Sequence, residues 1–364
     1  MSKILIAYLV RKSGHHAAAL AVEEALHAED PSVETLCVDL LGYTHPHWAA
    51  LIERMYMSTI RRTPDVWETL YDNPVVERTT RRVRNLVQQG RSKPLLSLME
   101  DFRPDAAVCT QAHPLAVLNA YANRDRPDLS LWGVVTDFVP HRFWVVNGST
   151  HYFVPNQSAA DRLIWLGIAS NRIKVTGIPV RPGTAQPQVK DDNARRVLVM
   201  GGGRGMGIAG HTVRRLDRCP APFTIDVVSG TNRKLRRDLV VARGRFQHPL
   251  RVRGYVHNAA ALMGSASLLI GKPGGLTSAE AMAVGLPMVI VRPLPGQEKG
   301  NADCLVRHGA AVRVEGDREI TKVVTALFEK PPLLQMMHER ALALGRPHAA
   351  ADIAKRIVAR LAER

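Results

Sequence analysis

Cysteine is scarce in this 364-residue sequence, and a long apolar segment is missing from its N-terminus. Only seven apolar or aromatic residues, 4–10, precede Arg11, which is too few for a spanning helix, and no small-residue cleavage site follows. We therefore read residues 4–10 as a first buried strand and expect a reduced, cytoplasmic compartment. The four cysteines are isolated and lack the short paired spacings of zinc or redox sites: Cys37, Cys109, Cys219 and Cys304.

Acidic residues are also few, because 33 Asp and Glu face 49 Lys and Arg and leave a formal charge of +16. Such an excess attracts polyanions, namely nucleic acid, anionic lipid headgroups or phosphorylated substrates. The alternative is a basic surface that reflects genome composition alone. The sequence has no aromatic RNA-binding motif, zinc-finger spacing or helix-turn-helix signature, so we do not favour nucleic acid as a partner.

Short apolar runs alternate with helical patterns along nearly the whole chain, which predicts an α/β fold with two doubly wound, Rossmann-like domains facing across a cleft. The length also favours two domains. We place the domains at 1–182 and 193–345, joined by a polar segment rich in turn residues, and expect the helix in 346–364 to pack back on the first domain. The predicted strands are 3–10, 33–38, 106–110, 131–136, 151–154, 196–200, 224–228, 251–254, 267–270, 288–291 and 311–314.

A glycine-rich turn over residues 201–207 follows the strand predicted at 196–200. Glycines at such a turn let backbone N–H groups approach a phosphate, and the next helix adds the positive end of its dipole. We therefore expect this turn to face a phosphate-bearing ligand. A purely structural tight turn is the alternative, since no acidic residue on the next strand matches the ribose contact of a dinucleotide fold.

A second glycine turn, Gly274 and Gly275, follows the strand predicted at 267–270 and opens another helix. Glu280 lies about one turn into that helix, where a carboxylate can accept both hydroxyls of a ribose. The alternative role of Glu280 is to stabilise the helix dipole. A loop further along the chain carries Gln297 and Glu298, whose amide and carboxylate suit sugar hydroxyls, although a solvated polar loop has the same composition.

His15 lies where the first predicted strand turns into the first helix, at the carboxyl edge of the sheet. A histidine there can take a proton from an acceptor hydroxyl near neutral pH, whereas most isolated histidines are structural or solvated. Asp137 follows another predicted strand, and we expect it to orient His15. His113 follows the strand at 106–110.

These motifs together resemble the diacylglycerol glycosyltransferases, which include the monogalactosyldiacylglycerol synthases and the processive diacylglycerol glucosyltransferases. The similarity covers nearly the full length in order. The matching segments are Gly14-His15, 103–105, 113–114, Thr136-Asp137, Trp144, 154–156, 175–180, 200–207, 230–232, 254–256, 272–287 and 296–298.

The resemblance implies a GT-B fold and an inverting transfer of glucose or galactose from a UDP-sugar to diacylglycerol, without a cofactor or a bound metal. It implies that His15 is the catalytic base with Asp137 beside it, that Tyr255 and Val256 read uracil, and that Glu280 holds the ribose. The implied contacts to the UDP-sugar are Gly203, Gly205, Gly207, Asn232, Tyr255, Val256, Gly274, Gly275, Thr277, Glu280, Gln297 and Glu298.

A lipid acceptor requires contact with the membrane, and residues 47–93 suit a peripheral protein on the cytoplasmic side. Apolar and aromatic residues come first, and no acidic residue occurs from 78 to 93, so this segment can approach anionic membrane lipids. The alternative is a buried amphipathic helix followed by a solvated basic one. The expected acceptor and membrane contacts are Gly14, His113, Trp48, Trp67, Arg78, Arg81, Arg82 and Arg84.

Two other functions remain open at this stage. One is a transferase that moves N-acetylglucosamine from its UDP derivative to a polyprenyl-linked peptidoglycan precursor. The other is a nucleotide-binding protein without catalysis. The residues alone do not distinguish glucose from galactose, because epimers differ in the direction of one hydroxyl.

Overall fold

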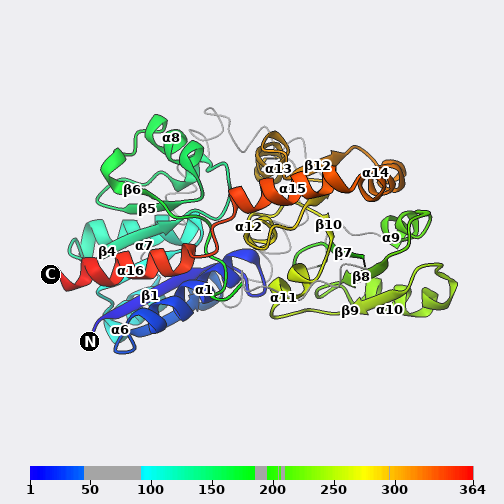
Figure 1. Ribbon diagram of the computed structural model, residues 1–364. Coiled ribbons are helices and arrows are strands. Elements are labelled where there is room, and N and C mark those ends of the chain that lie inside the picture. The colour runs from blue at the N-terminus through cyan, green and yellow to red at the C-terminus, as the bar shows by residue number, and fades with distance from the viewer. Residues whose placement is uncertain (45–91, 185–194, 204, 206–209, 295, 364) are drawn as a thin grey trace, which may run out of the picture. The chain divides into compact units, whose positions relative to one another are not determined.

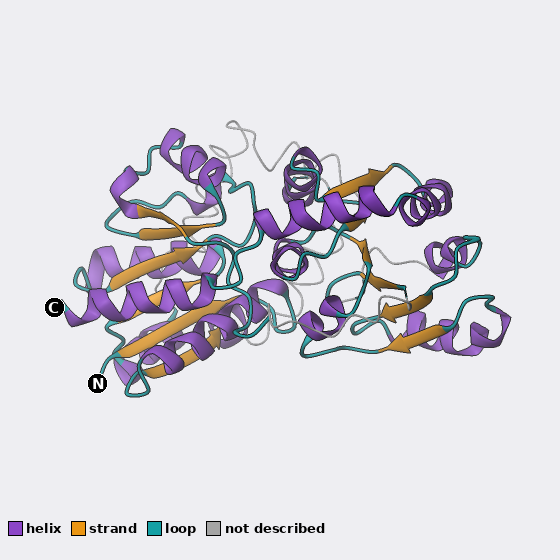
Figure 2. Ribbon diagram, viewed as in Figure 1, coloured by secondary structure: helices purple, strands orange, loops and turns teal. Residues whose placement is uncertain are grey.

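The computed structural model describes residues 1–44, 92–184, 195–203, 205, 210–294 and 296–363. The chain divides into two compact units. Unit 1 contains residues 1–182, 295–297 and 348–364, and unit 2 contains residues 183–294 and 298–347. Each unit is an α/β layer structure around its own sheet, as the strands and helices in Figure 2 show.

Unit 1 is built on a six-stranded parallel sheet in the order β2-β1-β3-β4-β5-β6 (Figure 1). The strands are β1 (Lys3–Tyr8), β2 (Glu34–Asp39), β3 (Ala106–Cys109), β4 (Ser130–Val134), β5 (His151–Val154) and β6 (Ile173–Val175). The helices are α1 (Gly14–Glu29), α2 (Leu40–Thr44), α6 (Lys93–Phe102), α7 (Ala112–Asp125), α8 (Gln157–Trp165) and α16 (Ala349–Ala362), with short 3-10 turns at Arg142–Trp144 and Ser170–Arg172.

The strands predicted for unit 1 were incomplete, because they numbered five and omitted β6. The reason is the position of β6 at the sheet edge, where only Ile173 is buried while Lys174 and Val175 are exposed. Three residues with one buried side chain do not produce a recognisable apolar run.

The last helix of the chain, α16, belongs to unit 1, where it packs on α1 (Figure 1). Ile353 and Ile357 of α16 are fully buried in one apolar cluster with Val22 of α1 and Ile6 of β1. The helix α16 therefore covers one face of the sheet that contains β1.

Unit 2 contains a second six-stranded parallel sheet in the order β12-β11-β10-β7-β8-β9. The strands are β7 (Arg196–Met200), β8 (Thr224–Val228), β9 (Leu250–Arg253), β10 (Leu268–Gly271), β11 (Met288–Val291) and β12 (Ala311–Val314). The helices are α9 (Gly210–Leu216), α10 (Arg233–Ala242), α11 (Ala259–Gly264), α12 (Gly275–Ala283), α13 (Gln297–Arg307), α14 (Asp317–Glu329) and α15 (Pro331–Leu344), with a 3-10 turn at Arg243–Arg245.

Both sheets confirm the predicted doubly wound α/β class, and each has a point where the strand order reverses. In unit 1 the reversal lies between β1 and β3, and in unit 2 it lies between β7 and β10. Loops that leave such neighbouring strands diverge and open a crevice at the carboxyl edge, where ligands of these folds bind. The crevice positions are therefore the loops after β1 and β3 and the loops after β7 and β10.

Within the part of the chain that the structure describes, every helix is too short or too polar to cross a membrane.

Candidate functional site

His15 occupies the first turn of α1, directly beyond the carboxyl end of β1. Ser13 caps this helix by accepting a hydrogen bond from the His16 backbone N–H at 3.2 Å. Two non-glycine residues before the cap, Val10 and Lys12, have left-handed backbone angles with φ of 67° and 62°. Such angles carry a local conformational cost and persist only where surrounding contacts hold them. The loop that delivers His15 is therefore tightly constrained.

Two groups hold the imidazole of His15 in place through Nδ1. The carbonyl oxygen of Thr110 lies 3.0 Å from Nδ1, and the hydroxyl of Thr136 lies 2.8 Å from it. A carbonyl can only accept a hydrogen bond, so we assign the proton of the neutral ring to Nδ1. The Thr136 hydroxyl donates to the same carbonyl at 3.3 Å and accepts from Nδ1. Nε2 is left with its lone pair, which is the form that a general base requires.

Burial and charge act in opposite directions on His15. Burial is the larger effect and lowers the pKa of the imidazole, whereas the negative charge of Asp137 and the hydrogen bond to Thr110 raise it. The lowered pKa favours the neutral form of the ring. Asp137 is itself buried, with 7% exposed, and lies three residues beyond the end of β4. Its effect on His15 comes from its negative charge.

His141 is a second buried histidine near His15. Burial lowers the pKa of His141 to about 3, and the charges of His15 and Arg162 act in the same direction. The Nδ1 of His141 accepts a hydrogen bond from the Phe143 backbone N–H at 3.2 Å. His141 is therefore neutral at physiological pH and caps the short turn that begins at Arg142.

The sequence analysis included Thr136 in the matching segment Thr136-Asp137 but gave it no role of its own, and it did not name Thr110. Both residues are buried and both stand just beyond a strand end, Thr110 after β3 and Thr136 after β4. Polar residues at the carboxyl ends of neighbouring parallel strands are a usable signal, which was applied to Thr136-Asp137 but not to Thr110. Gly14 begins α1 and His113 lies in the first turn of α7, both at the same edge of the sheet as His15.

In unit 2 the glycine turn after β7 packs against the turn after β8. Gly205 has φ of +62°, and a Cβ added there would lie 1.9 Å from the Ser229 carbonyl oxygen. Gly230 has φ of +58°, and its Cβ would lie 2.4 Å from the Gly203 carbonyl oxygen, which accepts a hydrogen bond from the Thr231 N–H at 3.0 Å. The two turns therefore approach so closely that neither tolerates a side chain.

The beginning of α12 has the form of an anion site. Gly274 is the N-cap and provides no side-chain cap, so the first N–H groups, from Gly275 to Thr277, are not satisfied by a capping side chain. The first turn also carries no acidic residue. The hydroxyl of Ser278 is fully buried and has no hydrogen-bond partner among the described residues. Glu280 follows on the partly buried side of the helix.

An ion pair that the sequence reasoning missed joins Lys272 to Glu298. The ammonium nitrogen of Lys272 lies 2.8 Å from Oε1 of Glu298, and the two side chains are 9% and 19% exposed. The other carboxylate oxygen of Glu298 accepts a hydrogen bond from the Leu294 N–H at 2.7 Å. One turn further into α13, Asn301 donates to the Pro273 carbonyl at 3.0 Å. The start of α13 is therefore fastened to the loop after β10.

The remaining predicted contacts lie at strand ends or helix starts. Asn232 is the N-cap of α10 and accepts from the Leu235 N–H at 3.0 Å, so it has a structural role as well. Tyr255 and Val256 follow β9 and are partly buried. Gln297 is the first residue of α13. Gly207 and the predicted membrane residues lie outside the described residues: Trp48, Trp67, Arg78, Arg81, Arg82 and Arg84.

The predicted residues thus form two groups at two sheet edges. His15, Asp137, Gly14 and His113 gather in unit 1, and the glycine turns, Glu280 and Glu298 gather in unit 2. The first group offers a neutral imidazole with a free-base nitrogen. The second offers backbone N–H groups and a buried lysine, a combination suited to a phosphate-bearing ligand.

Comparison with solved structures defines the class of the fold as GT-B, with two Rossmann-like domains. The glycosyltransferase of kitacinnamycin superimposes with a TM-score of 0.65 at 14% identity, covering 99% of both chains. Anabaena HepE, in complex with UDP-glucose, gives 0.61 at 14% identity and covers both chains completely.

Sequence comparison then shows which families the two halves of the chain resemble. Residues 15–180 match the monogalactosyldiacylglycerol synthase model, and residues 196–357 match the C-terminal domain of glycosyltransferase family 28. The processive diacylglycerol beta-glucosyltransferase of Bacillus cytotoxicus is 27% identical over 96% of this chain and 92% of its own length. The chain is thus similar over nearly its whole length to the diacylglycerol glycosyltransferases, as the sequence motifs predicted.

The close packing at Gly205 predicts that two glycine-to-alanine substitutions differ in their effect on stability. Gly205→Ala should destabilise the protein by about 1–3 kcal/mol, because the turn must move away from the Ser229 carbonyl and adopt a strained angle. Gly244→Ala is the control, since a Cβ there meets nothing within 4 Å. Thermal unfolding of both variants tests this, and equal midpoints would contradict the close packing.

The lowered pKa of His141 predicts that the free energy of unfolding decreases in acid. As pH falls from about 6.5 toward 3, the unfolded chain binds a proton at this position and the folded chain does not, so stability is lost at up to about 1.4 kcal/mol per pH unit. His141→Asn keeps an acceptor for the cap and removes the titration. The variant should lose less unfolding free energy than the wild type between pH 6.5 and 4.5 in urea titrations. Parallel losses would show that His141 is protonated in the folded state.

Proposed function

We propose that this protein transfers a hexose, glucose or galactose, from a UDP-sugar to the hydroxyl of diacylglycerol, with inversion at the anomeric carbon. The observation that carries the proposal is the fixed orientation of His15, whose Nδ1–H is held by Thr110 so that Nε2 is the basic nitrogen. The family resemblance supports the class of reaction, and the Bacillus cytotoxicus relative is named for a diacylglycerol acceptor.

The proposed chemistry is a single displacement. The acceptor oxygen attacks the anomeric carbon of the sugar, the bond from that carbon to the UDP oxygen breaks, and the acceptor proton passes to Nε2 of His15. The imidazolium that forms is stabilised by the negative charge of Asp137, which already raises the pKa of His15 in the free protein. Asp137 therefore acts through charge, and Thr110 and Thr136 act as positioning residues.

Unit 2 is proposed to bind the donor. The closely packed turns after β7 and β8 and the start of α12 supply backbone N–H groups for the diphosphate. Glu280 is proposed to hold the ribose, Tyr255 and Val256 the uracil, and Gln297 with Glu298 the sugar. The UDP-glucose complex of Anabaena HepE, which shares the fold, supports a nucleotide-sugar ligand.

We propose that the reaction uses no cofactor and no metal ion. The N–H groups at the start of α12 and the buried ammonium of Lys272 are suited to offset the charge of a leaving diphosphate. The acceptor is a lipid, so we also propose that the protein works as a peripheral protein at the cytoplasmic face of the membrane and is attracted there by anionic lipids. The net charge of +16 supports this attraction.

The function is tested by incubating the purified protein with diacylglycerol vesicles and a panel of radiolabelled UDP-sugars. We expect a labelled glycolipid from UDP-glucose or UDP-galactose, and an equal rate after addition of EDTA. The product is separated by thin-layer chromatography. Label transferred only to a polyprenyl phosphate acceptor, or not at all, would contradict the proposal, and a loss of activity in EDTA would contradict the metal-free mechanism.

The role of His15 is tested by His15→Gln, with His16→Gln as a matched control on the same helix turn. Removing the base should lower kcat by about 10²–10⁴-fold while UDP affinity stays within a few-fold, and His16→Gln should retain most activity. Because the pKa of His15 is lowered, kcat/KM of the wild type should begin to fall only below about pH 6.5. A normal rate for His15→Gln would show that another group removes the proton.

A further inference from the structure

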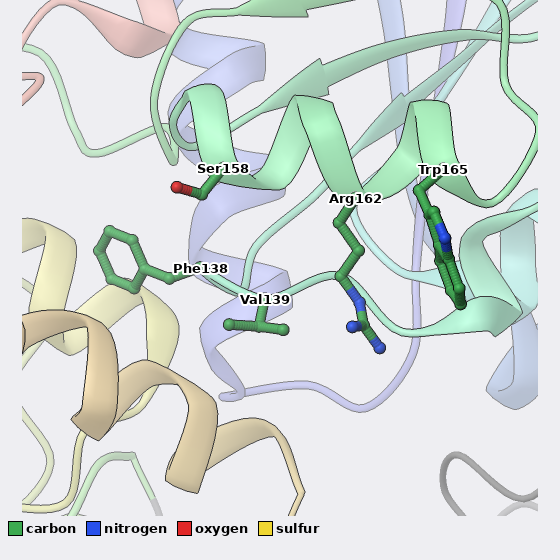
Figure 3. Close-up of a pocket in the computed structure, with 5 residues that line it drawn as sticks. All are labelled: Phe138, Val139, Ser158, Arg162 and Trp165. Atoms are coloured by element: carbon green, nitrogen blue, oxygen red, sulfur yellow. The ribbon is translucent and has the colours of Figure 1, made fainter.

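A pocket opens beside the segment that follows Asp137, and neither the family motifs nor the proposed chemistry uses it. It has a volume of about 420 Å³, within the range of small-molecule sites. Phe138 and Val139 line it from the loop, and Ser158, Arg162 and Trp165 line it from α8. Figure 3 shows Arg162 and Trp165 pointing from α8 toward the segment that carries Val139.

The three lining residues of α8 are spaced so that they share one face of the helix. The helix is fastened to the loop, because Nε of Arg162 donates to the Pro140 carbonyl at 2.6 Å. The same loop reaches His15, because the hydroxyl of Thr136, two residues before Phe138, lies 2.8 Å from Nδ1 of His15. A short chain of neighbouring residues therefore connects the pocket to the candidate base.

Two large apolar side chains at the end of α8 are exposed to solvent. Trp165, which lines the pocket, is 75% exposed, and Ile164, the residue before it in the chain, is 42% exposed. Indole rings in this situation are typical of the boundary between water and a bilayer, where the ring meets the lipid and the N–H meets water. The cationic Arg162 beside Trp165 matches the negative surface of a leaflet with anionic lipids.

We propose that this pocket holds an acyl chain of the diacylglycerol acceptor while its hydroxyl lies at His15, and that Trp165 and Ile164 face the bilayer from which the lipid comes. The inference rests on the proposed function. An apolar occupant fits because Phe138, Val139 and Trp165 supply most of the lining. The location fits because the first lining residue, Phe138, directly follows Asp137 in the chain.

The test uses diacylglycerols with six, eight and ten carbons per chain, at concentrations below micelle formation. If the pocket buries the chain, kcat/KM should rise with length, by up to about fourfold for each methylene that enters it. Val139→Phe fills the pocket and should flatten this dependence, so that the ratio of ten-carbon to six-carbon kcat/KM falls at least several-fold. Val241→Phe, at a position 79% exposed on α10, is the matched control and should keep the wild-type ratio.

A binding measurement separates this inference from the proposed function. Diacylglycerol with brominated chains should quench tryptophan fluorescence in the wild type, and most of that quenching should disappear in Trp165→Phe. An unchanged ratio in Val139→Phe, or quenching that Trp165→Phe leaves intact, overturns the pocket assignment even if glycolipid is made. Quenching that depends on Trp165 with no transfer to any chain length upholds the pocket and overturns the proposed reaction.

Discussion

The hydrogen bond between the Nδ1 of His15 and the Thr110 carbonyl is the interaction on which the chemistry of unit 1 depends. It joins the first turn of α1 to the residue after β3, and it exists because β1 and β3 are neighbours at the point where the strand order reverses. A second hydrogen bond joins the same two residues, because the Thr110 hydroxyl donates to the His15 carbonyl at 2.9 Å. One pair of residues thus fixes both the helix start and the tautomer of the ring.

His15 and His141 are both buried in unit 1, but their charged neighbours differ and act differently on their pKa values. Burial lowers the pKa of both, but only His15 has a nearby carboxylate that opposes this effect. The charge of Asp137 therefore favours protonation of His15, whereas His141 stays neutral and serves as a structural cap. The same loop, from Thr136 to His141, carries the positioning hydroxyl, the carboxylate and the wall of the lipid pocket. A displacement of this loop would disturb all three.

The main constraint in unit 2 is a different one, namely the close approach of two backbone turns to each other. The turns after β7 and β8 approach so closely that a Cβ at Gly205 or Gly230 would overlap a carbonyl oxygen. The ion pair of Lys272 with Glu298 then holds the start of α13 against the loop after β10. A buried pair of this kind is weak evidence for stability, and its value here is to fix the direction of the Glu298 carboxylate.

The sequence alone determined the α/β class, eleven of the strands, the resemblance to diacylglycerol glycosyltransferases and the position of His15 and Asp137 at strand ends. These features follow from apolar periodicity and glycine turns, which are local signals. It did not reveal β6, whose three residues at the edge bury one side chain. Only the tertiary structure decided that Thr110 and Thr136 orient His15, that Lys272 pairs with Glu298, and that Trp165 borders a pocket. These contacts join residues 26 to 121 positions apart in sequence, and their formation depends on which strands lie side by side. Strand order is set by the packing of the whole unit, which no short stretch of residues encodes.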